Sequence, residues 1–401
     1  MTAALSPSGL ARLHDRMAAH VSSGEMPGLA LLVARGDEVH VETIGAPAFG
    51  AASRLDRSAI FRIASLTKPV TAVAAMTLVD EGVLALDQPV DRLLPELAGR
   101  RVLRSIDASL DDTVPAARPI TVEDLLSYRM GFGSIMAPPG TYPIQRAEEA
   151  VRLQSIGGPP WPPTTHTPDS WMAALGSLPL MYQPGAQWLY GTSGQVLGVL
   201  VARAAGRDVG TVFRERIFSP LGMADTGFTV PAGDLGRLVT AYAPDPASGG
   251  GGGGLAVLDD PRASWWATPP SFPDCAGWLV STIDDYWAFA RMLARGGDPI
   301  LSPASVALLT ADRLTAAQRA ASTVFLGEHG GWGLGLATPA AGSTAPLPYG
   351  YGWEGGTGTS WRTHPASGVT GILFTQRAVT SPEMPPPMRD FWAGVNDAAG
   401  L

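Results

Sequence analysis

The chain has 401 residues, of which 45% are hydrophobic and 16% are charged, a composition typical of a globular protein with two domains or one large two-part fold. Its formal net charge of -8 at pH 7 argues against nucleic acid as a partner. The single cysteine, Cys275, excludes an internal disulfide. Residues 1–26 lack the apolar run of a signal peptide, and no stretch is long enough for a membrane span. We therefore expect a cytoplasmic protein with no membrane partner.

Hydrophobic periodicity predicts a mixture of helices and strands. Helices are expected over residues 6–21, 65–80, 121–126, 169–178, 195–205, 284–293 and 387–395. Strands are expected over residues 28–33, 39–44, 359–363 and 369–376. The first two strands flank a short turn and form a predicted β-hairpin. Ser6 or Ser8, Thr121 and Asp169 have side chains suited to cap the first, third and fourth helices.

Two segments outside these elements are rich in turn-forming residues. Residues 131–168 abound in Gly and Pro, which favours either a long ordered loop over a pocket or a disordered linker. The uninterrupted glycine run at 249–254 is short and far from any predicted helix start. We therefore expect a flexible loop there and no phosphate-binding loop.

The order of the elements indicates how the domains are organised. Strands come early, helices occupy the middle and strands return late, which is typical of a split α/β domain with a helical domain inserted between its halves. On this layout residues 1–85 and 300–401 form the sheet-containing domain. Residues 86–299 form a mainly helical domain with long loops.

Ser65 and Lys68 stand three residues apart at the start of the second predicted helix, so they share one helical face. Pro69 is tolerated in a first turn, where its missing N–H costs little. The free N–H groups and the positive dipole end of a helix N-terminus favour a developing negative charge. A serine becomes a good nucleophile when a neighbouring base, such as a lysine, takes its proton. The pattern alone is weak, and a helix start with a surface lysine stays open as an interpretation.

Two further stretches strengthen the catalytic interpretation of this pair. They are residues 183–198 (QPGAQWLYGTSGQVLG) and residues 352–361 (GWEGGTGTSW). Together with the Ser-x-x-Lys pattern, and in this order, they resemble the class C β-lactamase superfamily, most closely its esterase branch, the family VIII carboxylesterases. The similarity runs from Met26 to Arg377. It implies a β-lactamase/transpeptidase-like α/β (α+β) fold, with an antiparallel sheet flanked by the N- and C-terminal helices and an inserted helical domain.

The resemblance assigns roles to the second stretch. Tyr190 matches the tyrosine of the family's Tyr-x-Asn motif, which implies that it shuttles the serine proton together with Lys68. Thr192 stands where asparagine is usual and is expected to contact substrate. Because Thr192 is shorter and has no amide, the asparagine's contacts to the lysine and to substrate stay open. A packed aromatic residue beside a turn is the alternative for Tyr190.

The third stretch departs from the β-lactamase pattern. Trp353-Glu354-Gly355 stands where β-lactamases and peptidases have Lys-Thr-Gly or His-x-Gly, and it is similar to the Trp-Gly-Gly of family VIII esterases. Gly355 and Gly356 fit a strand edge that substrate approaches closely. The resemblance implies that the N–H groups of Ser65 and Gly356 form an oxyanion hole.

The same departure bears on the substrate. The resemblance implies that a lysine or histidine at the position of Trp353 helps to hold the substrate carboxylate in β-lactamases and peptidases, whereas the indole offers one N–H and a large apolar face. We therefore expect Trp353 and Gly355 to contact a neutral ester. Glu354 would repel a carboxylate if it faced the site, and Arg362 is a nearby cation that could replace the missing one.

These inferences predict a serine hydrolase that cleaves small esters through an acyl-enzyme on Ser65. A β-lactamase, D,D-peptidase, amidase or acyltransferase on the same fold is the alternative, and a catalytically silent binding protein is a second. The chain has no Gly-x-Ser-x-Gly elbow, and no pair of its six histidines has ligand spacing. We expect no metal and no cofactor, and a small ester or amide as the partner. The sequence leaves the oligomeric state open.

Overall fold

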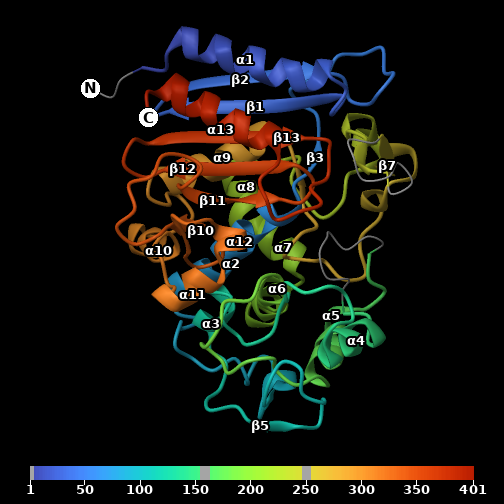
Figure 1. Cartoon of the computed structure of the whole chain (residues 1–401), viewed down its shortest axis with the longest axis vertical. Helices are drawn as coiled ribbons and strands as arrows, with labels where there is room; N and C mark the ends of the chain where they lie inside the picture. Colours follow the sequence, from blue (N-terminus) through green and yellow to red (C-terminus); the bar gives the residue numbers. More distant parts are fainter. Residues whose placement is uncertain (1–3, 154–162, 246–253) are drawn as a thin grey trace.

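A seven-stranded antiparallel sheet in the order β2-β1-β13-β12-β11-β10-β9 organises the protein (Figure 1). The computed structural model describes residues 4–153, 163–245 and 254–401. The strands of the sheet are β1 (Gly28–Arg35), β2 (Glu38–Gly45), β9 (Gly330–Trp332), β10 (Ala337–Pro339), β11 (Tyr351–Gly355), β12 (Thr359–His364) and β13 (Val369–Thr375). Three smaller pairs join β3 (Phe61–Arg62) to β8 (Val280–Ser281), β4 (Arg101–Leu103) to β5 (Thr113–Pro115), and β6 (Ala241–Pro244) to β7 (Leu255–Asp259).

The helices lie at both ends of the chain and between the two groups of sheet strands. They are α1 (Pro7–Ser22), α2 (Thr67–Asp80), α3 (Val122–Leu126), α4 (Pro143–Ala150), α5 (Pro168–Gly176), α6 (Thr192–Ala205), α7 (Val209–Phe213), α8 (Ser219–Leu221), α9 (Ile283–Ala294), α10 (Pro303–Leu309), α11 (Ala316–Ala321), α12 (Thr323–Leu326) and α13 (Pro386–Ala399). None of the helices in the described ranges has the length and apolar character needed to cross a membrane.

The first and last helices cover one face of the sheet. Figure 1 shows α1 and α13 side by side along the strands, and both helices contribute side chains to the core beneath them. Strand β1 is buried along its whole length. Because successive side chains of a strand point to opposite faces, Leu29, Leu31 and Val33 join the core under α1 and α13, while Ala30 and Leu32 join the main core on the other face. The predicted sheet with flanking terminal helices is confirmed.

Helix α2 passes through the interior below the sheet. Of its 14 residues, 12 are buried, and it contacts α6 and α7. Its residues are small or apolar nearly all the way round, which is typical of an interior helix. Lys68 is the one ionisable residue among the buried twelve, so the fold carries a lysine amino group into the core at the start of α2.

Most of the predicted elements are confirmed, including the hairpin of β1 and β2, the helix after Ser65, the cap at Thr121 and the pairing of β12 with β13. The predicted cap of α5 was wrong. Thr167 caps this helix by accepting the N–H of Ser170, and Asp169 lies in the first turn. Pro168 at the first helical position fixes this start.

The structure differs in detail from two other predictions, the start of α6 and the loop at residues 131–168. Helix α6 begins at Thr192, three residues before its predicted start, because Gly191 turns the chain at φ 98°. The segment 131–168, expected to be a loop or a linker, contains helix α4, which begins at Pro143. Residues 249–253 of the glycine run lie outside the described residues.

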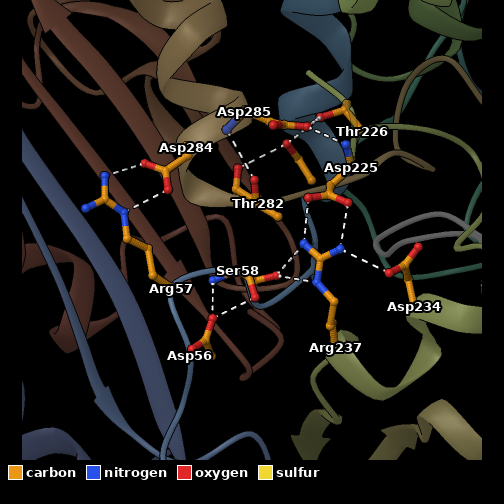
Figure 2. A network of polar contacts seen from close by, with 11 residues as sticks. Asp56, Arg57, Ser58, Asp225, Thr226, Asp234, Arg237, Thr282, Asp284 and Asp285 are labelled. Atoms are coloured by element: carbon orange, nitrogen blue, oxygen red, sulfur yellow. Dashed lines mark hydrogen bonds and ion pairs between the residues drawn. The ribbon is translucent and has the colours of Figure 1, made fainter. Parts of the chain in front are cut away.

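A polar network fixes the segment that leads into β3 (Figure 2). Arg57 donates to both carboxylate oxygens of Asp284 at 2.8 and 2.7 Å. Arg237 forms a bidentate pair with Asp225 and also donates to the Ser58 carbonyl at 3.1 and 2.9 Å. Exposed ion pairs contribute little singly, but planar bidentate contacts define geometry. The network therefore fastens the segment before β3 to the first turn of α9 and to the 225–237 segment.

Candidate active site

Ser65 lies in a single 3-10 turn, Ala64–Leu66, between β3 and the first residue of α2. Ala64, directly before it, has φ 44°, a left-handed conformation that few residues other than glycine adopt. Strained backbone of this kind tends to occur at functional sites, where the surrounding structure holds it in place. The predicted position of Ser65 at a helix N-terminus is confirmed.

The side chain of Lys68 meets Ser65 inside the fold. The residue is 3% exposed, and its Nζ donates to Ser65 Oγ at 2.9 Å and to the carbonyl oxygen of Ala276 at 2.6 Å. The Nζ also lies 4.5 Å from the centre of the Tyr190 ring. Among the described residues no carboxylate forms an ion pair with Lys68. The amino group of Lys68 is thus held by a hydroxyl, a carbonyl and an aromatic face, and the alternative of a solvated surface lysine is wrong.

Tyr190 is held in place by aromatic neighbours. Its ring stacks on Phe325 at a centroid distance of 5.1 Å, and its Oη accepts a hydrogen bond from Trp353 Nε1 at 2.7 Å. Trp188 and Trp332 pack around the same ring. Each aromatic contact restricts the ring, and the indole N–H occupies one acceptor position of the phenol oxygen. The phenol is therefore oriented with respect to the lysine.

The indole nitrogen of Trp353 thus has a partner inside the protein. Trp353 is 4% exposed, and its N–H is directed at Tyr190. Its neighbour Glu354 accepts two hydrogen bonds from Arg362 at 2.8 and 2.7 Å, and Arg362 donates a third to the Gly350 carbonyl. The hypothesis that Arg362 replaces the missing cation is therefore not favoured, because its charge is compensated by Glu354.

Thr192 occupies the first turn of α6. In the described parts of the chain its hydroxyl makes no hydrogen bond to Lys68 or Ser65, so the contact that asparagine would make to the lysine is absent here. The carbonyl of Ala276 provides an acceptor for the lysine instead.

The loop that presents Ala276 was not found by sequence reasoning. The Asp274 carboxylate accepts the Ala276 N–H at 2.7 Å and the Gln195 amide at 3.0 Å, which turns the Ala276 carbonyl toward the lysine. Thr71 of α2 donates to the Cys275 carbonyl at 2.7 Å, so the loop runs along the helix that carries Lys68. A backbone carbonyl has no side-chain signature, and no sequence signal would have identified it.

A second tyrosine lies behind the site. Tyr128 packs against Trp332 and lies near Tyr190, at ring-centroid distances of 4.8 and 6.3 Å. Burial, followed by the charges of Tyr190 and Asp274, raises the pKa of Tyr128 well above its ordinary value. Tyr128 therefore keeps its proton, so its hydroxyl can donate or accept a hydrogen bond but does not act as a base.

Gly355 and Gly356 bring the end of β11 to the turn that carries Ser65. A Cβ on Gly355 would lie 2.5 Å from the Ile63 carbonyl oxygen and 2.0 Å from Thr359 Oγ1, so no other residue fits there. The close approach at Gly355 is therefore to the protein's own backbone. Gly356, which follows, accepts a hydrogen bond from the Val379 N–H through its carbonyl at 2.8 Å.

Comparisons with known proteins identify the family of the chain. A family model described as Beta-lactamase matches residues 13–389, so the chain belongs to the β-lactamase family. Within the described residues no three His, Cys, Asp or Glu side chains are grouped as metal ligands. The family and the fold define a β-lactamase-fold serine hydrolase.

Individual relatives show which members of the family the chain resembles. Protein Rv1367c of Mycobacterium tuberculosis (strain ATCC 25618 / H37Rv) is 38% identical over 368 residues, which are 88% of this chain and 86% of that protein. Esterase EstB of Burkholderia gladioli is 28% identical over 373 residues, again 88% and 86% of the two chains. The solved structure of EstCE1, described as a hydrolase with promiscuous acyltransferase activity, has a TM-score of 0.77 at 24% identity and covers 98% of both chains. The chain is thus related to the family VIII esterases, and its relatives include both esterases and acyltransferases.

Proposed function

We propose that the protein hydrolyses neutral carboxylic esters through an acyl-enzyme on Ser65. The observation that carries this proposal is the contact between Lys68 Nζ and Ser65 Oγ at 2.9 Å, with Tyr190 beside the same amino group. A serine at hydrogen-bond distance from a lysine fits an acyl-transfer site in which the serine is the nucleophile and the lysine is its base.

The proposed reaction uses two steps. Ser65 Oγ attacks the ester carbonyl carbon while Lys68, as the uncharged amine, takes its proton, and the N–H groups of Ser65 and Gly356 hold the oxyanion. The carbon–oxygen bond to the alcohol breaks, and the alcohol leaves with a proton supplied by the pair of Lys68 and Tyr190. Water then attacks the acyl carbon and gives a proton to the same pair. The bond from the acyl carbon to Ser65 Oγ breaks, the pair returns a proton to Oγ, and the acid is released.

The pairing of Arg362 with Glu354 supports a neutral ester over a β-lactam. Trp353 directs its N–H at Tyr190, and Arg362 is paired with Glu354, so neither supplies a charge for a substrate carboxylate. Thr192 stays a candidate for substrate contact, because its hydroxyl is not engaged by Lys68. The aromatic side chains around Tyr190, including Phe325, would favour an apolar acyl or alcohol group.

Acyl transfer is the second candidate. Acyltransferase calJ of Penicillium decumbens is 28% identical over 283 residues, 70% of this chain and 63% of that protein. The same acyl-enzyme would then be resolved by an alcohol or an amine in place of water.

A substrate panel tests the proposal. We expect p-nitrophenyl acetate and butyrate to be cleaved with a kcat/KM roughly a hundredfold or more above that of a chromogenic cephalosporin, as expected for the loss of one charged contact worth about 3 kcal/mol. Acyl transfer would be seen as an ester product when a primary alcohol is added. Comparable kcat/KM values for the acetate and the cephalosporin would contradict the ester specificity.

A further inference from the structure

Two buried threonines at the start of β12 hold the backbone that precedes the nucleophile. Thr359 Oγ1 donates to the carbonyl oxygen of Ile63 at 3.0 Å, and Thr357 Oγ1 donates to the carbonyl oxygen of Arg62. Their exposed fractions are 0% and 4%. Both hydroxyl groups therefore connect β12 and the turn before it to the two residues that end β3 and enter the strained turn.

The backbone conformation of Ile63 and Ala64 depends on contacts with other segments of the chain. Ile63 and Ala64 lie between the end of β3 and the start of α2, and Ala64 is held at φ 44°. The Ile63 carbonyl accepts from the Leu66 N–H at 3.1 Å within the turn and from Thr359 across to the sheet. A left-handed alanine persists only where the surrounding contacts fix it.

The same contacts lie next to the two proposed oxyanion donors in the chain. Gly356 lies between Gly355, which touches the Ile63 carbonyl, and Thr357, which binds the Arg62 carbonyl. The Ser65 N–H belongs to the residue that directly follows Ala64 in the strained turn. The hydrogen bond from Thr359 to Ile63 therefore joins the segment that carries the Ser65 N–H to the strands on either side of Gly356.

We infer that Thr359, assisted by Thr357, is a positioning residue for the oxyanion hole. Its hydroxyl keeps the N–H groups of Ser65 and Gly356 directed at one oxygen atom. Donors of this kind stabilise a transition state only when they are fixed in advance, and small displacements weaken them. The inference rests on the proposed acyl-enzyme function, and it concerns kcat rather than substrate affinity.

The test compares three variants of buried threonines in the sheet. Thr359→Val keeps the shape and removes the donor, while Thr359→Ser keeps the donor. Thr370→Val is the matched control, because Thr370 is also buried and its hydroxyl bonds to Thr363 Oγ1 at 2.9 Å, on β12 and β13 and without contact to the Ser65 turn. The measurements are kcat and KM for p-nitrophenyl butyrate, the melting temperature, and the inhibition constant of phenylboronic acid, which forms a tetrahedral adduct with a reactive serine.

We expect Thr359→Val to lower kcat by roughly 10- to 100-fold with KM nearly unchanged, and to weaken boronic acid inhibition in parallel, since one misplaced donor costs less than a deleted one. Thr359→Ser should restore most of the kcat, and Thr370→Val should keep it. A kcat for Thr359→Val equal to that of Thr370→Val would overturn the inference, as would a raised KM with unchanged kcat. If Thr359→Val does not fold, Thr357→Val applies the same test.

The control for the underlying function is separate. Hydrolysis of p-nitrophenyl butyrate by Ser65→Ala at the wild-type rate would contradict the acyl-enzyme proposal itself, whatever the results for the threonine variants. If Ser65→Ala is inactive while Thr359→Val keeps the wild-type kcat and boronic acid inhibition, the acyl-enzyme proposal stands and only the positioning role of Thr359 is contradicted.

Discussion

Replacing Glu148 by glutamine should stabilise the protein at alkaline pH. Glu148 is a buried residue of α4 whose Oε2 has no hydrogen-bond partner among the described residues. Burial raises the pKa of its carboxyl group from the ordinary 4.5 to about 8. The folded protein therefore keeps a proton that the unfolded chain has already released.

The magnitude follows from the two pKa values. The contribution of Glu148 to the free energy of unfolding is fully present below pH 4.5 and is lost as the pH rises to about 8. At about 1.4 kcal/mol for each pH unit, the loss across this window is roughly 5 kcal/mol, an upper value because a charged Glu148 would relax toward water. Glutamine has a similar shape and does not titrate. Glu148→Gln should therefore match the wild type near pH 4.5 and exceed its stability by several kcal/mol, about 3 to 5, at pH 8.5.

Thermal melts at a series of pH values from 4.5 to 9 measure this effect. Glu149→Gln is the matched control, since Glu149 is the exposed neighbour on the same helix and should leave the pH dependence unchanged. Melting temperatures of wild type and Glu148→Gln that run parallel across the whole range would refute the reasoning, because they would show that Glu148 is hydrated in the folded protein.

The other predictions concern the proton-handling groups. Lys68→Ala combined with Tyr190→Phe should lose much less activity than the product of the two single losses, because the two side chains contact each other and act as one unit. Additive losses in ester hydrolysis would show that they act independently. Trp353→Phe removes the N–H that binds Tyr190 Oη but keeps an aromatic ring, and it should lower kcat roughly 5-fold, about 1 kcal/mol, with little change in KM. A larger effect on KM than on kcat would instead indicate that Trp353 binds substrate.

The parts of the site that depend on short-range sequence could be predicted. Ser65 and Lys68 are one helical turn apart, so their proximity follows from helix geometry alone. Outside the site, the start of α5 could also have been predicted from the sequence, because Pro168 marks its first position and Thr167 precedes it. The prediction placed the cap at Asp169, which has an equally suitable side chain.

The rest of the site depends on contacts between distant segments. The hydrogen bond between Trp353 and Tyr190 spans 163 residues of sequence, and the bond between Lys68 and Ala276 spans 208. Thr359 reaches Ile63 across 296 residues. Such contacts are set by the packing of the whole sheet on α2, and they leave no pattern in any one stretch of sequence. The division into domains at residues 85 and 300 stays a prediction.

The most direct measurement is the mass of the protein after reaction with a fluorophosphonate, followed by peptide mapping. A covalent adduct on Ser65, absent in Ser65→Ala and in protein denatured before labelling, is the predicted result, with loss of ester hydrolysis in proportion to labelling. An adduct on a different serine, or full esterase activity in Ser65→Ala, would contradict the account.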